Sequence, residues 1–184
     1  MIEFDLFPTL VILKKGFINF SILDRLRKLK PVMSKHKSIK GDGVSSYSND
    51  YDIIKNDEEL RYKINFELKN MSMKLGIPNQ KIHNSWINIQ NEGSFLSYHK
   101  HAQSNISGAI YIDVDEGCSP LKFLNPNPYI FMQSARNSTK YNYEYVDIQP
   151  ENGSLILFPS WLSHGSEFNN TTRKVLSFNS RDDG

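Results

Sequence analysis

Apolar residues recur once per helical turn between Asp57 and Gly76, and this spacing predicts an amphipathic helix. Asp57 can cap the start of the helix, and Gly76, followed by Pro78, can end it. The predicted apolar face consists of Leu60, Ile64, Leu68, Met71 and Leu75.

Shorter patterns precede this helix. Residues 4–13 are rich in aromatic and branched side chains and predict a strand, which Pro8 places at a sheet edge or bulge. Ser21 can cap a short helix over residues 22–30. Residues 33–50 have no period and many Ser, Lys, Gly and Asp residues, so we expect a loop there.

After Pro78, short β-like runs alternate with turn residues, which favours a sandwich or barrel. We therefore predict one mainly β domain over residues 1–184. Residues 1–80 would supply an N-terminal strand and supporting helices, and residues 81–184 the β core. The long connection 125–142 is expected to act as a lid or substrate loop. The predicted strands cover residues 82–90, 94–99, 106–114, 121–124, 143–148, 154–158, 163–168 and 174–180.

Composition places the chain among ordinary globular proteins. Its 184 residues are 39% hydrophobic and 23% charged, enough for one core. No apolar run reaches the roughly 18 residues of a transmembrane helix, and the N-terminus lacks the basic segment of a secretory signal. Cys118 is the lone cysteine, so no internal disulfide can form. We therefore expect a cytoplasmic protein without membrane association, and the sequence leaves its oligomeric state open.

The net charge and its distribution along the chain exclude few functions. The net charge of +2 is too small to argue for a nucleic-acid partner. Basic residues cluster between Arg25 and Lys40, which favours either an anionic partner or, more simply, a solvated helix end and loop.

Three histidines offer a metal site. His99 and His101 are two residues apart, so on a strand they would point to the same face. His164 follows a predicted strand far downstream and would have to be adjacent in space. Neutral imidazole binds iron, zinc and copper, and three such ligands leave coordination positions open for catalysis. The pair of His99 and His101 alone is equally consistent with two metal ligands and with two exposed histidines that bind no metal. His36 and His83 lie outside these two segments. His36 is interpreted as a loop residue and His83 as a strand residue.

Further motifs accompany the histidines, and they are densest from Trp86 to Asn179. They are Leu6-Phe7-Pro8-Thr9, Ser46-Tyr47-Ser48, Trp86-Ile87-Asn88, Gly93, His99-x-His101, Ser107-Gly108-Ala109-Ile110-Tyr111, the run from Gly153 to His164, Arg173 and Ser177-Phe178-Asn179. With these residues most of the chain resembles the 2-oxoglutarate and Fe(II)-dependent oxygenases. The matching branch is bacterial and phage-borne, has a His-x-His…His motif and is distantly similar to prolyl hydroxylases and nucleic-acid-repair dioxygenases. The resemblance implies a double-stranded β-helix, the cupin-like jelly roll, which agrees with the predicted strands.

The resemblance also implies the roles of individual residues. His99, His101 and His164 would bind the catalytic iron. Arg173 would pair with the distal carboxylate of 2-oxoglutarate, for which its planar guanidinium is suited. Asn88 and, more weakly, Asn179 would hydrogen-bond the same co-substrate.

The chain departs from the commonest family pattern at one position. His101 stands where the facial triad usually has Asp or Glu, which leaves the site one charge more positive. A carboxylate from Asp113 or Asp115 remains an alternative ligand, and zinc or nickel remain alternative metals.

The implied activity consumes O2 and 2-oxoglutarate and yields succinate and CO2 while a substrate is hydroxylated. That substrate can be a peptide, a nucleobase or a small metabolite. Two other functions stay open: a cupin-type three-histidine metalloenzyme that does not use 2-oxoglutarate, and a non-catalytic jelly-roll binding module.

Overall fold

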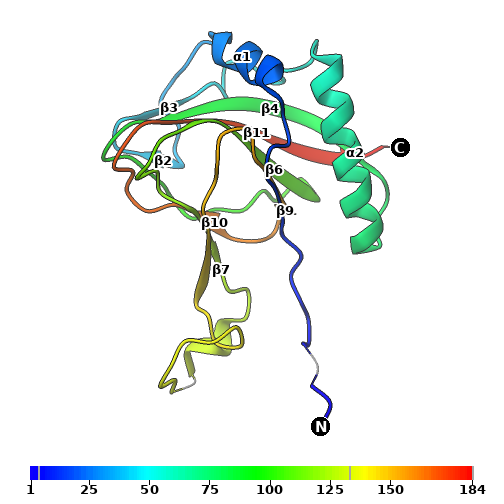
Figure 1. The fold of residues 1–184 in the computed structure, drawn as a ribbon, viewed down its shortest axis with the longest axis vertical. Helices are drawn as coiled ribbons and strands as arrows, with labels where there is room; N and C mark the ends of the chain where they lie inside the picture. The colour runs from blue at the N-terminus through cyan, green and yellow to red at the C-terminus, as the bar shows by residue number, and fades with distance from the viewer. Residues whose placement is uncertain (4, 133, 184) are drawn as a thin grey trace.

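The computed structural model describes residues 1–3, 5–132 and 134–183 and shows a mainly antiparallel β protein (Figure 1). The strands are Ile12–Lys14 (β1), Ile39–Lys40 (β2), Gly43–Ser45 (β3), Gln80–Gln90 (β4), Phe95–Leu96 (β5), Ile106–Val114 (β6), Leu121–Leu124 (β7), Tyr145–Ile148 (β8), Leu155–Pro159 (β9), His164–Gly165 (β10) and Arg173–Asp182 (β11). Within the described residues, the largest sheet runs in the order β1-β9-β6-β11-β4-β3. A second sheet runs β10-β7-β8, and β2 pairs with β5. The predicted mainly β architecture is confirmed.

Two α-helices, Phe20–Lys28 (α1) and Glu58–Leu75 (α2), lie along one side of the large sheet (Figure 1). A short 3-10 helix, Pro128–Met132 (η1), follows β7. The prediction for α2 is confirmed at both ends. The Asp57 side chain accepts a hydrogen bond from the Leu60 amide at 3.1 Å, and Gly76 ends the helix in the left-handed conformation with φ 66°. Among the described residues, no helix is both long and apolar enough to span a bilayer.

The large sheet buries apolar side chains on both faces. One face packs against α1 and α2, with Ile64 and Leu68 of α2 fully buried beside Leu176 and Phe178 of β11. The opposite face contributes Val175, which packs with residues of the smaller sheet and its flanks. The members of this second cluster are Ala109, Tyr111, Leu121, Phe123, Ile156, Phe158, Leu162 and Val175. The molecule is therefore a sandwich of two sheets with helices on its outer face.

The N-terminal segment departs most from the sequence predictions. The strand predicted over residues 4–13 is reduced to β1, because only Ile12–Lys14 finds a partner strand, β9. Phe4 itself lies outside the described residues, and Phe7 is exposed. The cap of α1 is Asn19, not Ser21: the Asn19 side chain accepts from the amide of Ile22, and the helix begins at Phe20.

The predicted loop over residues 33–50 contains β2 and β3, two short strands that pair with β5 and β4. Strands of two and three residues are too short to show a period in the sequence. Downstream, β6 and β7 have the predicted bounds, whereas β5 and β10 are two residues each. The connection 125–142 extends away from the sandwich beyond β7 (Figure 1), and none of its described residues lines the main cavity. The segment does not cover the cavity in this structure, and its role as a lid or substrate loop stays a prediction.

Side-chain alternation along β11 links the core to the cavity. Leu176 and Phe178 belong to the core that packs against the helices, while Arg173, Val175 and Ser177 line the cavity on the opposite face. Phe178 also borders the cavity. Because β11 pairs with β4 on one side and β6 on the other, its neighbours share this division.

Close packing at Gly108 of β6 yields a stability prediction. A Cβ atom there would overlap the ring of the fully buried Phe178 and the side chain of Leu157. We expect Gly108→Ala to lower the free energy of unfolding by about 1–3 kcal/mol in urea titrations. The control is the double variant with Phe178→Leu, which makes room for the new methyl group. The double variant should lose less than the sum of the single losses, and strict additivity would show that Gly108 is not constrained by this contact.

Candidate metal centre

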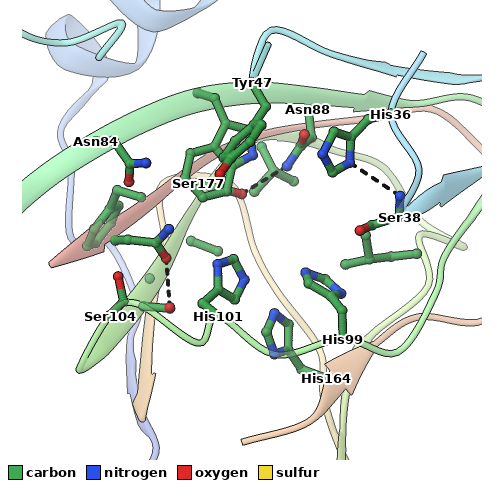
Figure 2. A pocket seen from close by; sticks show the side chains of 18 of the residues that line it. His36, Ser38, Tyr47, Asn84, Asn88, His99, His101, Ser104, His164 and Ser177 are labelled. Carbon is green, nitrogen blue, oxygen red and sulfur yellow. Dashed lines mark hydrogen bonds between the residues drawn. The ribbon is translucent and has the colours of Figure 1, made fainter. Parts of the chain in front are cut away.

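The three predicted histidines come together at one end of the smaller sheet. Each offers a ring nitrogen, and these atoms lie within 4.8 Å of one another. The ring centroids are 4.4 Å apart for His99 and His164, 5.2 Å for His101 and His164, and 5.0 Å for His99 and His101. Figure 2 shows the three rings facing the same space. This geometry fits one metal ion.

The backbone brings the histidines together differently from the prediction. The predicted strand over residues 94–99 is real only at Phe95–Leu96, so a shared strand face does not explain the pair. Instead, His99 exchanges two backbone hydrogen bonds with His164, of 3.0 and 3.1 Å, in an isolated antiparallel bridge. The amide of His101 donates to the Ser160 carbonyl at 2.9 Å. Pairing with the segment around β10 therefore holds both residues in place.

Hydrogen bonds donated to backbone carbonyls fix the tautomers of two rings. Nδ1 of His99 lies 2.8 Å from the Ser97 carbonyl, and Nδ1 of His164 lies 2.9 Å from the Leu162 carbonyl. A carbonyl oxygen only accepts hydrogen bonds, so each Nδ1 carries the proton. Each Nε2 is then left with a free lone pair, as in histidines that bind metals.

Burial keeps these imidazoles neutral. It lowers the pKa of His101 to about 4, with further contributions from His99 and His36. Burial is also the main cause that lowers the pKa of His99 and, more strongly, that of His164. Near neutral pH the cluster therefore presents lone pairs rather than positive charges.

Arg173 lies in the same cavity, and only 2% of it is exposed. Its Nε donates to Oε1 of Gln90 at 2.8 Å and its Nη1 to the Ser119 carbonyl at 2.7 Å. No carboxylate in the described part of the chain forms an ion pair with it. A buried cation without a counter-charge is costly, so this position fits an anionic ligand.

Gln90 supports the same conclusion. Its Nε2 is buried and has no hydrogen-bond partner. The amide cannot be reversed, because Arg173 has only donors and needs the oxygen facing it. Gln90 therefore offers an unused donor beside the guanidinium, where a carboxylate would satisfy both.

Asn88 and Asn179 also line this cavity, whose volume is about 540 Å³. Nδ2 of Asn88 donates to Ser177 at 3.0 Å (Figure 2), and Oδ1 of Asn179 accepts from Ser107 at 2.8 Å. All six candidate site residues that were predicted from the sequence thus line this cavity. The alternative carboxylates do not: Asp113 pairs with Arg27, and none of the described lining residues is Asp or Glu.

Several cavity residues were missed from the sequence. Gln90 lies two residues beyond Asn88 on β4, and Asn84 and Trp86 lie on the same face. The period of two along this strand was the available signal. His36 and His83, interpreted as a loop and a strand residue, are in those settings but also line the cavity.

Several solved structures are similar in fold to this chain. Among solved structures, a prolyl-4-hydroxylase from Pseudomonas putida is 15% identical, with a TM-score of 0.57 over 98% of this chain and 96% of that one. HygX from Streptomyces hygroscopicus, solved with nickel and 2-oxoglutarate bound, is 8% identical, with a TM-score of 0.63 over 95% and 84%. The non-heme alpha-ketoglutarate-dependent epimerase SnoN from nogalamycin biosynthesis is 12% identical, with a TM-score of 0.62 over 94% and 78%. At these identities the similarity shows the fold.

A search of curated proteins gave no match. The sequence model of a family described as "Putative 2OG-Fe(II) oxygenase" matches residues 84–179, more than half of the 184 residues. The matched segment contains the three histidines, Arg173, Asn88 and Asn179. The chain therefore belongs to the 2OG-Fe(II) oxygenase family, whose members use iron(II), 2-oxoglutarate and O2.

Proposed function

We propose that this protein is a hydroxylase in which His99, His101 and His164 hold the iron and Arg173 binds 2-oxoglutarate. One observation carries the proposal: three neutral imidazoles and a buried, uncompensated guanidinium share one cavity. The imidazoles suit a divalent metal, and the guanidinium suits the carboxylate of a metal-chelating acid.

The protein's part is to hold these groups in place. The carbonyls of Ser97 and Leu162 fix the rings of His99 and His164, so that their free nitrogens are available to the metal. Gln90 and the Ser119 carbonyl orient Arg173 by accepting hydrogen bonds from its Nε and Nη1. The distal carboxylate of 2-oxoglutarate would accept from the guanidinium and from Nε2 of Gln90.

Asn88 and Asn179 are the remaining candidates for the co-substrate. Asn88 lies between Gln90 and Trp86 on the cavity face of β4, and its cross-strand partner on β11 is Val175. We assign Asn88 to the polar wall beside 2-oxoglutarate. Asn179 lies farther along β11 from Arg173, so its role in co-substrate binding is the weaker one.

Bound iron(II) and 2-oxoglutarate supply the oxidation, in which O2 is consumed and succinate and CO2 are released as the substrate gains a hydroxyl group. With His101 in place of a carboxylate, the protein contributes only neutral ligands to the metal. The dianion of 2-oxoglutarate and the cation of Arg173 then set the remaining charge of the site.

Arg173 also separates this function from a three-histidine metalloenzyme that does not use 2-oxoglutarate. In that case the arginine would have no ligand to bind and would be expected at the surface. Instead it is buried and faces the histidine cavity.

The first test is succinate formation from 2-oxoglutarate by protein loaded anaerobically with Fe(II). We expect slow, oxygen-dependent turnover even without a substrate. The His164→Ala variant should lose both this turnover and iron binding. Analysis of substrate products then distinguishes hydroxylation from epimerisation. Absence of oxygen-dependent succinate from fully iron-loaded protein would rule the proposal out.

The second test concerns Arg173. Arg173→Ala should raise the KM for 2-oxoglutarate at least about tenfold, because one charge-assisted contact is worth roughly 1.5–3 kcal/mol. Arg173→Lys should restore only part of the affinity for 2-oxoglutarate, since Lys cannot pair with a carboxylate in a bidentate manner. Iron affinity, followed by metal titration, should stay unchanged.

Arg27→Ala provides the matched control for the Arg173 test, because it removes one cation that pairs with Asp113 outside the cavity. An equal rise in KM for the control would assign the effect to overall charge rather than to the pocket.

A further inference from the structure

The cavity continues beyond the residues assigned to iron and 2-oxoglutarate. Arg173 begins β11, and Asn179 and Arg181 near the other end of the strand line the same cavity. Its volume of about 540 Å³ is that of pockets that hold drug-sized ligands. There is therefore room for a second molecule beside the co-substrate.

Asn84 provides an unused hydrogen-bonding group at this far end. Only 8% of Asn84 is exposed, and its Oδ1 is buried without a partner. Its cross-strand neighbour Asn179 already accepts from Ser107, so the two amides do not satisfy each other. Figure 2 shows Asn84 reaching from β4 toward the side of the cavity where Ser104 and His101 lie. A ligand with a polar group at this position would complete the hydrogen bonding of the Asn84 amide.

The charges lining the cavity are all positive. Lys37, Lys100 and Arg181 are exposed cations of the cavity wall, and no described lining residue is acidic. Elsewhere in the basic stretch, both arginines form ion pairs: Arg25 pairs with Asp57 and Glu59, and Arg27 pairs with Asp113. Lys37 is the member of this stretch that reaches the cavity, which therefore suits an anionic ligand.

Partly exposed aromatic rings also line this cavity. Tyr47 is 44% exposed and Tyr51 61% exposed, and both line the cavity. The ring of Tyr47 contacts Trp86 edge-on at 4.9 Å and His36 at 5.2 Å. These contacts hold Tyr47 in place and leave part of its ring available to a flat ligand.

We propose that the prime substrate is a nucleotide, free or within a single strand. Its base would hydrogen-bond the Asn84 amide and stack against Tyr47, and its phosphate would lie against the cations of the cavity wall. Cationic grooves with exposed aromatic rings are the common means of binding single strands. An acidic peptide would satisfy the cations but would leave the aromatic rings without a flat partner. The proposal rests on the function proposed above, because it names the substrate of the same site.

Binding can be read from Trp86, which lines the cavity. The only other tryptophan, Trp161, is 52% exposed and does not line it, so Trp161→Phe leaves Trp86 as the reporter. We expect a short single-stranded DNA of mixed sequence to quench its fluorescence. A mixture of nucleoside 5′-monophosphates forms a second arm, and an acidic peptide of equal charge a third. Tighter binding of the strand identifies nucleic acid as the source, and equal binding of the monophosphates identifies free nucleotides.

Variants locate the ligand. Asn84→Ala should weaken binding about tenfold, with an unchanged or raised melting temperature because the Asn84 oxygen has no partner to lose. Arg181→Ala should reduce the salt dependence of strand binding by about 0.7 in the logarithmic slope, the value for one phosphate contact. Lys81→Ala is the control: Lys81 is the cross-strand neighbour of Arg181 but pairs with Asp183 and does not line the cavity.

Three results would overturn the proposal: quenching by the acidic peptide alone, unchanged binding by Asn84→Ala, or equal effects of Lys81→Ala and Arg181→Ala. The binding assay needs no turnover, so its failure is distinct from failure of the proposed function. Succinate formation without nucleotide binding would leave the oxygenase function intact and remove this substrate. Nucleotide binding without any succinate formation, with or without the strand, would remove both the oxygenase function and the substrate role.

Discussion

The pairing of β11 with β4 and β6 is the constraint on which the core and the cavity both depend. In this central strand, Leu176 and Phe178 pack beneath the helices, and Arg173 and Ser177 face the cavity. A slip of one residue would exchange these faces, exposing the apolar side chains to the cavity and burying the arginine in the core. The burial of Leu176 and Phe178 therefore also fixes the depth of Arg173. Stability of the fold and placement of the co-substrate residue are set by the same register.

The histidine cluster depends on a much smaller pairing. Two backbone hydrogen bonds between His99 and His164 join segments that are remote in sequence, and neither histidine of the pair His99 and His101 belongs to a regular strand of the large sheet. The amides of Ser166 and His101, which donate to the carbonyls of Leu96 and Ser160, extend this pairing on either side of the bridge. The carbonyls of Ser97 and Leu162 then orient the individual rings. Orientation at the metal site is thus a local property of short hydrogen bonds, whereas orientation of Arg173 is a property of the sheet.

This difference explains what could be predicted from the sequence. Long periodic elements were recognisable: α2 has both predicted caps, and β6 has its predicted bounds. The N-terminal strand was mostly wrong, since aromatic and branched residues suit a strand only where a partner strand exists. The three histidines and Arg173 were found because a motif marks them. Gln90 was not, because its importance arises from Arg173 across the β4–β11 ladder, a contact that no local pattern encodes.

Most of the buried groups that folding leaves unsatisfied in the described part of the chain lie around one cavity, and Nδ2 of Asn169, which does not line the cavity, is the exception. Arg173 lacks a carboxylate among the described residues, and Gln90 and Asn84 each have a buried polar atom without a partner. Such local violations of otherwise consistent packing are typical of functional sites. They also have a thermodynamic consequence, because a ligand that satisfies them binds the folded chain and not the unfolded one. The two unpaired amides lie on β4, with Trp86 and Asn88 between them. This separation along one strand argues for two ligand positions in the cavity rather than one, with the co-substrate at the Arg173 end and the substrate at the Asn84 end.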